Sequence, residues 1–454
     1  MTPPLHDAAD RARIRGDAPP GALDETLIVE AAAGTGKTTE LVGRIVRVLA
    51  TGRAGIQQIA AVTFTEKAAG ELKLRLREAV EKARARATGD EARHLDAALR
   101  QLENAHVTTI HGFCAELLRE RPVEAGLDPL FQVLTEPQAT RLFNSVFDPW
   151  LQAQLASPPE GVRRMLRRRA WPSDAEGSSA GLKRAGLELA DWRDFDGDWT
   201  HPAFDRRGRI DALLDELRAV AAALRDPSSR YDALFASTWP IRTLVDDVER
   251  VEAVALRDYD GVEARLVALA RERDLAKLRK GTGALYRSGV TRDSVWQAIE
   301  RVRQSLAAFD MEVNADLAAL LRRDLRDLVD RYQRAKIEAG VVDFLDLLLR
   351  ARDLIRDDAA ARSSFQQRFA RIFVDEFQDT DPLQAEILLL LAADDPGEAG
   401  WRAVRPVPGK LFLVGDPKQS IYRFRRADIA LYEDTKARLV ARGATLVHLT
   451  TSFR

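Results

Sequence analysis

The sequence has little cysteine, no long apolar runs and almost no net charge, and each of these features bears on the class of protein. A single cysteine, Cys114, excludes an intrachain disulfide and a thiolate metal site. No apolar run approaches the roughly 20 residues that a membrane-spanning helix needs, and Met1 to Pro20 has no apolar signal-peptide core. These absences predict a cytoplasmic protein. The formal net charge of −1 leaves a nucleic-acid partner open, because lysines and arginines can gather in one groove.

The residues that are present indicate a folded protein of more than one domain. The chain has 454 residues, of which 46% are hydrophobic and 31% charged, a balance typical of globular proteins. Its length favours two or three domains. Short apolar segments followed by helical patterns predict an α/β fold with a parallel sheet. The predicted strands are Thr26 to Val29, Ile59 to Phe64, Arg371 to Val374, Lys410 to Val414 and Thr445 to Leu449.

Strand patterns are absent between about residues 126 and 335, where helical patterns prevail, for example Ile210 to Leu224 and Leu317 to Ala339. Because strand patterns resume afterwards, we expect a mostly helical domain inserted into the α/β domain. The predicted divisions are 1–125 and 336–454 for the two parts of the α/β domain, and 126–335 for the insertion.

A glycine-rich segment joins the first predicted strand to a helical pattern, which is the context of a phosphate-binding loop. Backbone N–H groups of such a loop converge on a β-phosphate, and the helix N-terminus adds the positive end of its dipole. Lys37 is expected to neutralise the β- and γ-phosphates, and the Thr38 hydroxyl to ligate Mg²⁺. The predicted nucleotide-binding residues are Ala31, Ala32, Ala33, Gly34, Thr35, Gly36, Lys37 and Thr38, with Ala31 in place of the usual first glycine. The alternative is a strand–helix turn without a ligand.

Two further predicted strands end in polar residues. Asp375, at a strand's carboxyl end, can hold Mg²⁺, and the adjacent Glu376 is placed to orient or deprotonate the attacking water. Such a pair alone is most often a solvated loop, but the phosphate loop in the same chain favours the catalytic interpretation. Gln419 follows the next strand and is expected to hydrogen-bond the γ-phosphate or the attacking water; the alternative is a surface turn residue.

Six segments, taken in order, give the chain a resemblance to the UvrD-like superfamily 1 helicases. They are AAAGTGKT (31–38), TFTEKAAGELKLRLR (63–77), TIHGFC (109–114), VDEFQDTDPLQ (374–384), VGDPKQSIYRFRRAD (414–428) and LTTSFR (449–454). The first and third segments and the long insertion look most like the RecB/AddA branch; the UvrD/Rep/PcrA branch is the alternative. The resemblance implies a RecA-like P-loop NTPase domain interrupted by the inserted domain.

The resemblance also implies roles for single residues. It implies contacts with single-stranded DNA for Thr63, Phe64, Thr65, His111, Tyr422, Phe424 and Arg425. Phe453 falls where the family packs a ring against adenine, and Arg454 where an arginine acts on the γ-phosphate, beside Glu376 and Gln419 in catalysis. Aromatic faces stack on any base, which suits a motor that ignores sequence.

Two departures from the family pattern matter. The family usually carries an adenine-recognising glutamine upstream of the phosphate loop, and the matching stretch, Asp7 to Ile14, contains none. Phe424 stands where tryptophan is more usual, so weaker base stacking is expected there.

The function implied by the resemblance is that of an ATP- and Mg²⁺-dependent DNA helicase with 3′→5′ polarity, acting on single-stranded and duplex DNA in double-strand-break repair and recombination. An AddB-like or RecC/RecD-like partner protein is expected, and no membrane. The family's later motifs, on a second RecA-like domain, and a nuclease signature are absent from these residues, so we expect ATP binding with poor hydrolysis. The alternative from another class is a nucleotide-dependent DNA-binding module, or an inactive relic.

Some side chains have a structural interpretation beside the functional one. His111 is as well explained by a structural role as by a DNA contact, and Cys114 is expected to be a buried small hydrophobe. The arginine-rich stretch 163–169 either grips duplex phosphates or forms a solvated helix face. Trp171, Trp192, Trp199 and Trp239 are expected in local cores rather than as base-stacking surfaces.

Overall fold

The computed structural model describes residues 5–168, 179–195, 197, 199, 203–419 and 429–453, which divide into two compact units. Unit 1 comprises Met1–Thr135 and Ala339–Arg454, and unit 2 comprises Glu136–Glu338. Each unit contains apolar cores of its own. Among the described residues, no helix combines the length and apolar character needed to cross a membrane.

Unit 1 is built on a six-stranded parallel sheet with the strand order β10-β1-β9-β8-β2-β3. The strands are β1 (Leu27–Ala31), β2 (Ile59–Thr63), β3 (His106–Thr109), β8 (Arg371–Val374), β9 (Leu411–Gly415) and β10 (Thr445–Leu449). The α/β class and the parallel sheet are therefore confirmed. Strands from before and after unit 2 interleave, so the two stretches of unit 1 form a single sheet.

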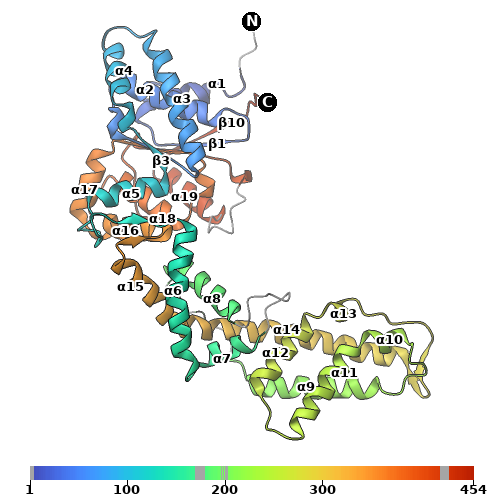
Figure 1. Ribbon diagram of the computed structural model, residues 1–454. Helices are drawn as coiled ribbons and strands as arrows, with labels where there is room; N and C mark the ends of the chain where they lie inside the picture. The colour runs from blue at the N-terminus through green and yellow to red at the C-terminus, as the bar shows by residue number, and fades with distance from the viewer. Residues whose placement is uncertain are drawn as a thin grey trace. The chain divides into compact units, whose positions relative to one another are not determined.

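Helices cover both faces of this sheet, because successive side chains of a strand point to opposite sides. Ile28, Val374 and Leu413 belong to the core on one face, and Val29, Phe373 and Phe412 to the core on the other. The first face carries α5 (Ile110–Glu120), α16 (Phe344–Asp357), α17 (Ala359–Arg368), α18 (Pro382–Ala392) and α19 (Ile429–Ala441). The second carries α1 (Ala8–Arg15), α2 (Lys37–Ala50), α3 (Glu66–Arg84) and α4 (Gly89–Arg100). Figure 1 shows α2, α3 and α4 on the opposite side of the sheet from α5, α16 and α18.

Short elements complete unit 1. Strand β3 was not predicted, because its four residues lie at the edge of the sheet and three of them are only half-buried, so no apolar run marks it. A second, two-stranded parallel sheet pairs β4 (Gln132–Val133) with β7 (Val341–Val342). Single 3₁₀ turns span Ala22–Asp24, Ile56–Gln58, Leu102–Asn104, Phe377–Asp379 and Pro417–Gln419.

Unit 2 has two successive cores that share one long helix, α14 (Arg292–Asp324). Its first part, through Val313, packs with α9 (Arg206–Ala223), α11 (Trp239–Glu252) and α12 (Tyr259–Ala270). Its last part packs with α6 (Glu136–Leu155), α8 (Ala180–Asp191) and α15 (Arg326–Glu338). The remaining elements are α7 (Glu160–Arg167), α10 (Ala233–Ser237), α13 (Arg273–Ala276), β5 (Leu285–Arg287) and β6 (Val290–Thr291).

The helical stretch predicted from Leu317 to Ala339 is confirmed, since α14 continues to Asp324 and α15 spans Arg326–Glu338. Two other expectations for unit 2 were wrong. The region is not free of strands, because β5 and β6 pair as an antiparallel hairpin too short to produce a strand pattern. Trp192, Trp199 and Trp239 are exposed rather than packed in local cores, and Trp171 lies outside the described residues.

Candidate functional site

The carboxyl ends of adjacent central strands bring the predicted catalytic segments to one edge of the sheet. Strand β1 ends at Ala31, β8 at Val374 and β9 at Gly415, and the order β1-β9-β8 makes these ends neighbours. Each is followed by one of the predicted segments: the glycine-rich loop, Asp375-Glu376, and Asp416 to Gln419. Open parallel sheets bind their ligands at this edge.

The glycine-rich loop turns the chain from β1 into α2. Gly34 and Gly36 have φ angles of +80° and +87°, which glycine adopts without steric cost. Thr35 is buried, and its hydroxyl donates to the Ala32 carbonyl at 2.7 Å, which fixes the turn from within. Because α2 begins at Lys37, the N–H groups of its first turn lack helical partners and can bind an anion.

Side chains of the loop contact the acidic turn after β8. Lys37 Nζ lies 3.0 Å from Glu376 Oε2, and the Thr38 hydroxyl donates to Asp375 Oδ2 at 3.4 Å. Glu376 has φ +56° and ψ +43°, in the left-handed region that non-glycine residues rarely adopt. Backbone strain of this kind concentrates at functional sites.

The acidic turn has more negative charge than its surroundings neutralise. Burial and the neighbouring charge of Glu376 raise the pKa of Asp375 to about 6, although Lys37 lowers it. Burial and Glu376 likewise raise the pKa of Asp379 to about 6. A divalent cation would supply the missing positive charge. The Thr38 hydroxyl and the Asp375 carboxylate are hard oxygen ligands that fit Mg²⁺, whose other positions are usually filled by phosphate oxygens and water.

Gln378, which was not predicted as a site residue, connects the acidic turn to the segment after β9. Its amide nitrogen donates to Glu376 Oε2 at 2.8 Å, and its amide oxygen accepts from the backbone N–H of Asp416 at 2.8 Å. The approach depends on Gly415, because a Cβ there would lie 2.9 Å from Gln378 Oε1. Gln419 also joins this group, since its amide donates to the carboxylate of Asp416.

The residues predicted to contact DNA lie at different depths. Thr65 is exposed and caps α3, with its hydroxyl accepting from the Ala68 N–H. Phe64 and His111 are half-buried, and the His111 ring meets Phe344 edge-on with centroids 5.6 Å apart. Thr63 is buried and lines a cavity of about 10 Å³ beside Asp375 and Glu376. Tyr422, Phe424, Arg425 and Arg454 lie outside the described residues.

A group of side chains that sequence reasoning missed lies next to the loop. Asp7 and Arg11 of the N-terminal segment are buried with Glu40 of α2. Phe453 is near them, and its backbone N–H donates to the Gly34 carbonyl at 2.9 Å. The available signal was the spacing of four between Asp7 and Arg11, which places an acid and a base on one face of a helix.

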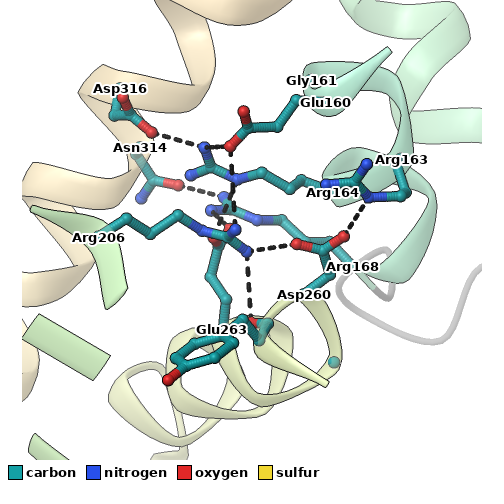
Figure 2. A network of polar contacts seen from close by, with 12 residues as sticks. Glu160, Gly161, Arg163, Arg164, Arg168, Arg206, Asp260, Glu263, Asn314 and Asp316 are labelled. Carbon is teal, nitrogen blue, oxygen red and sulfur yellow. Dashed lines mark hydrogen bonds and ion pairs between the residues drawn. The ribbon is translucent and has the colours of Figure 1, made fainter. Parts of the chain in front are cut away.

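The arginine-rich stretch of unit 2 forms an internal ion network (Figure 2). Arg164 is fully buried, with Nε 2.9 Å from Glu263 Oε2 and Nη1 2.6 Å from Asp316 Oδ2. Arg168 and Arg206 also converge on Glu263, each at 2.6 Å. Neither interpretation of the stretch holds for Arg164 and Arg168, because both guanidinium groups are turned inward onto carboxylates. Cys114 is buried, as expected.

The sheet, the loop and the acidic turn together define a P-loop nucleoside-triphosphatase domain of the RecA-like kind. The UvrD/REP helicase N-terminal domain family matches residues 17–439, and the chain belongs to this family.

Curated relatives are named as the A subunit of an ATP-dependent helicase/nuclease. The protein of Desulforudis audaxviator (strain MP104C) is 29% identical, over 96% of this chain and 38% of its own length. That of Pediococcus pentosaceus (strain ATCC 25745 / CCUG 21536 / LMG 10740 / 183-1w) is 26% identical, over 89% of this chain and 34% of its own length. That of Geobacillus kaustophilus (strain HTA426) is 28% identical, over 94% of this chain and 37% of its own length. The chain thus spans about a third of the length of these relatives.

Proposed function

We propose that this chain is the ATP-binding part of a DNA helicase that moves along single-stranded DNA with 3′→5′ polarity. The observation that carries the proposal is the pair of contacts that join loop and acidic turn, Lys37 to Glu376 and Thr38 to Asp375. The relatives named as ATP-dependent helicase/nuclease proteins support the RecB/AddA branch. Within that branch, the whole protein would act in double-strand-break repair and recombination with an AddB-like or RecC/RecD-like partner protein.

Each residue at the sheet edge is proposed to have a separate role in ATP hydrolysis. ATP with Mg²⁺ supplies the phosphoanhydride to be cleaved and the cation that balances its charge. Lys37, which contacts Glu376 in the unliganded chain, would bind the β- and γ-phosphates, and Thr38 and Asp375 would hold the Mg²⁺. Glu376, freed from Lys37 and held by Gln378, orients the attacking water and accepts its proton. Gln419 and Arg454 are proposed to contact the γ-phosphate, and Phe453 the base.

DNA binding is proposed for the segments that follow β2 and β3 and for the segment after Gln419. Thr65, Phe64 and His111 offer exposed or half-buried surface after the two strands. Thr63 is buried and lines one small cavity with Phe64 and Asp375, so it would link bound DNA to the metal site rather than touch the DNA itself. Tyr422, Phe424 and Arg425 supply the proposed aromatic and basic contact.

The test is ATPase activity with and without single-stranded DNA, measured on this chain and on the full-length gene product. We expect stimulation in the full-length protein and little turnover in this chain. Glu376→Gln in the full-length protein should keep ATP binding and lose turnover. Duplexes with a 3′ or a 5′ tail then determine the polarity. Full-length protein that binds DNA and ATP without stimulated turnover would instead indicate a binding module or a relic.

A further inference from the structure

Three charged side chains, Asp7, Arg11 and Glu40, are buried together beside the phosphate-binding loop, with relative exposures of 4%, 4% and 2%. Arg11 donates through Nε and Nη2 to the two carboxylate oxygens of Asp7, each at 2.9 Å. Its Nη1 donates to Glu40 Oε1 at 2.8 Å. Because a buried charge is costly unless partners of fixed geometry surround it, these bonds hold the guanidinium in one orientation.

The cluster ties the phosphate-binding loop to the segment that follows β10. Arg11 Nη2 donates to the Thr35 carbonyl at 3.0 Å, within the loop. Asp7 Oδ2 accepts from the backbone N–H groups of Thr450 and Thr451 at 2.9 Å and 3.0 Å. Burial raises the pKa of Asp7, but the hydrogen bonds from Arg11 and these N–H groups outweigh it and hold the pKa well below its usual value.

Phe453 lies between this cluster and the loop. The Arg11 guanidinium carbon lies over the Phe453 ring, 4.9 Å from its centroid. The ring edge also passes the loop, since a Cβ on Gly36 would lie 3.7 Å from both Phe453 and Arg11. Yet Phe453 is 63% exposed. The ring therefore has a cation on one side and open surface remaining, next to the proposed phosphate site.

We propose that Arg11, held by Asp7 and Glu40, is a positioning residue that fixes Phe453 as the platform on which the purine base of a bound nucleoside triphosphate stacks. The inference rests on the proposed nucleotide site. Within that site, it attributes the affinity for the base to Phe453 and its fixed position to Arg11. Arg11 acts through the ring rather than on the base, because its donors are already engaged by Asp7, Glu40 and Thr35. Clamping the ring removes rotamer freedom that ligand binding would otherwise have to restrict.

The test compares the dissociation constants of ATP and inorganic tripolyphosphate, both with Mg²⁺, by titration calorimetry. The dissociation constant of tripolyphosphate divided by that of ATP is the ratio that isolates the contribution of the nucleoside, and it falls when ATP alone binds more weakly. Arg11→Met should weaken ATP binding at least fivefold and change tripolyphosphate binding less than twofold. Phe453→Leu should lower the ratio similarly, and the double variant should lower it no further, because both act through one contact.

Arg15→Met is the matched control. Arg15 also pairs with Glu40, at 2.7 Å through both Nε and Nη2, but its side chain is half exposed and its bonds do not reach Phe453. The ratio of the two dissociation constants should be the same in Arg15→Met as in the wild-type chain. If Arg11→Met does not fold, Arg11→Lys keeps a cation between Asp7 and Glu40 without the planar guanidinium. A ratio lowered more than twofold in Arg11→Lys then supports the proposal, and an unchanged ratio overturns it.

Two other outcomes separate this inference from the proposed function. If Arg11→Met weakens the binding of ATP and tripolyphosphate equally, Arg11 supports the phosphate-binding loop rather than Phe453, and the proposal is overturned. Lys37→Ala should weaken binding of both ligands to a similar extent. If the wild-type chain binds neither, the nucleotide site itself is wrong, and this inference is overturned with it.

Discussion

Gln378 and Glu376 are joined by a 2.8 Å hydrogen bond from the amide nitrogen to Oε2, while the same amide accepts from the Asp416 N–H on the neighbouring strand end. The carboxylate proposed as the catalytic base is therefore oriented by a side chain that also contacts the segment after β9. A residue with this arrangement can couple movement of the segment after Gly415 to the position of Glu376.

Gln378→Leu should slow DNA-stimulated ATP turnover in the full-length protein by about 10- to 100-fold, the usual effect of losing an orienting partner. ATP affinity should stay within about threefold, because the phosphate loop is untouched. Steady-state kinetics and equilibrium binding measure the two quantities. Gln367→Leu, on the exposed surface of α17, is the control. Equal loss of affinity and turnover would show that Gln378 supports the fold instead.

Lys37→Ala should weaken ATP binding by about 2–5 kcal/mol, since it removes the cation from a half-buried, charge-paired position. The melting temperature of the unliganded chain should change little, because Lys37 bonds only with Glu376 among the described contacts. Calorimetry and thermal melting test both parts. Lys82→Ala, in which an exposed side chain paired with Glu78 is lost, serves as the control. Unchanged ATP affinity in Lys37→Ala would refute the phosphate-loop assignment.

Arg164→Met should destabilise the chain by about 3–5 kcal/mol, because it removes a fully buried guanidinium on which Asp316 depends, although Arg168 and Arg206 still neutralise Glu263. The neighbouring Arg163 is about half exposed and pairs with Asp260, which Arg206 also neutralises. Arg163→Met should therefore cost no more than about 1 kcal/mol. Urea denaturation of the two variants provides the comparison. If the free energy of unfolding falls by a similar amount in both variants, the burial of an arginine in this network does not determine how much it stabilises the chain.

Stability should rise with pH above about 8 because of Lys410. Burial, with a smaller effect from the charge of Arg371, lowers the pKa of Lys410 to about 8, while Nζ donates to the Gln366 carbonyl at 2.7 Å. Between this value and the ordinary pKa, the unfolded chain holds a proton that the folded chain lacks. The free energy of unfolding therefore increases with pH, by at most about 1.4 kcal/mol per unit for this one group.

Lys410→Met isolates that contribution. Urea denaturation from about pH 7 to about pH 10 spans the interval between the folded and unfolded pKa values. It should show a steeper rise for the wild-type chain than for the variant, because other lysines and tyrosines titrate equally in both. Parallel curves would mean that Lys410 keeps an ordinary pKa in the folded chain.

Sequence patterns predicted the elements whose signal is local and strong. Strands β1, β8 and β9 are covered on both faces, so they appear as continuous apolar runs. Lys37, Thr38, Asp375 and Glu376 were predicted from short motifs, and the parallel sheet brings them into contact because their strands end side by side. The family resemblance is likewise confirmed.

Features that depend on distant partners were not predictable in this way. Asp7 was noted only because its segment lacks a glutamine, whereas its contacts include residues more than 400 positions away. Arg164 belongs to a stretch that resembles a solvated or DNA-binding face until Glu263 and Asp316 are brought to it from other helices. Strand β3 lies at the edge of the sheet and is mostly half-buried, so its sequence contains no apolar run that would predict a strand.

The pairing of β4 with β7 has a consequence for how this protein can vary. The backbone leaves unit 1 just after Val133 and has returned by Val341, on strands only about 4.8 Å apart. A chain segment that departs and returns at adjacent points can be lengthened, shortened or exchanged without shifting the register of the six-stranded sheet. The NTPase scaffold can therefore be retained through evolution while the helical insertion diversifies.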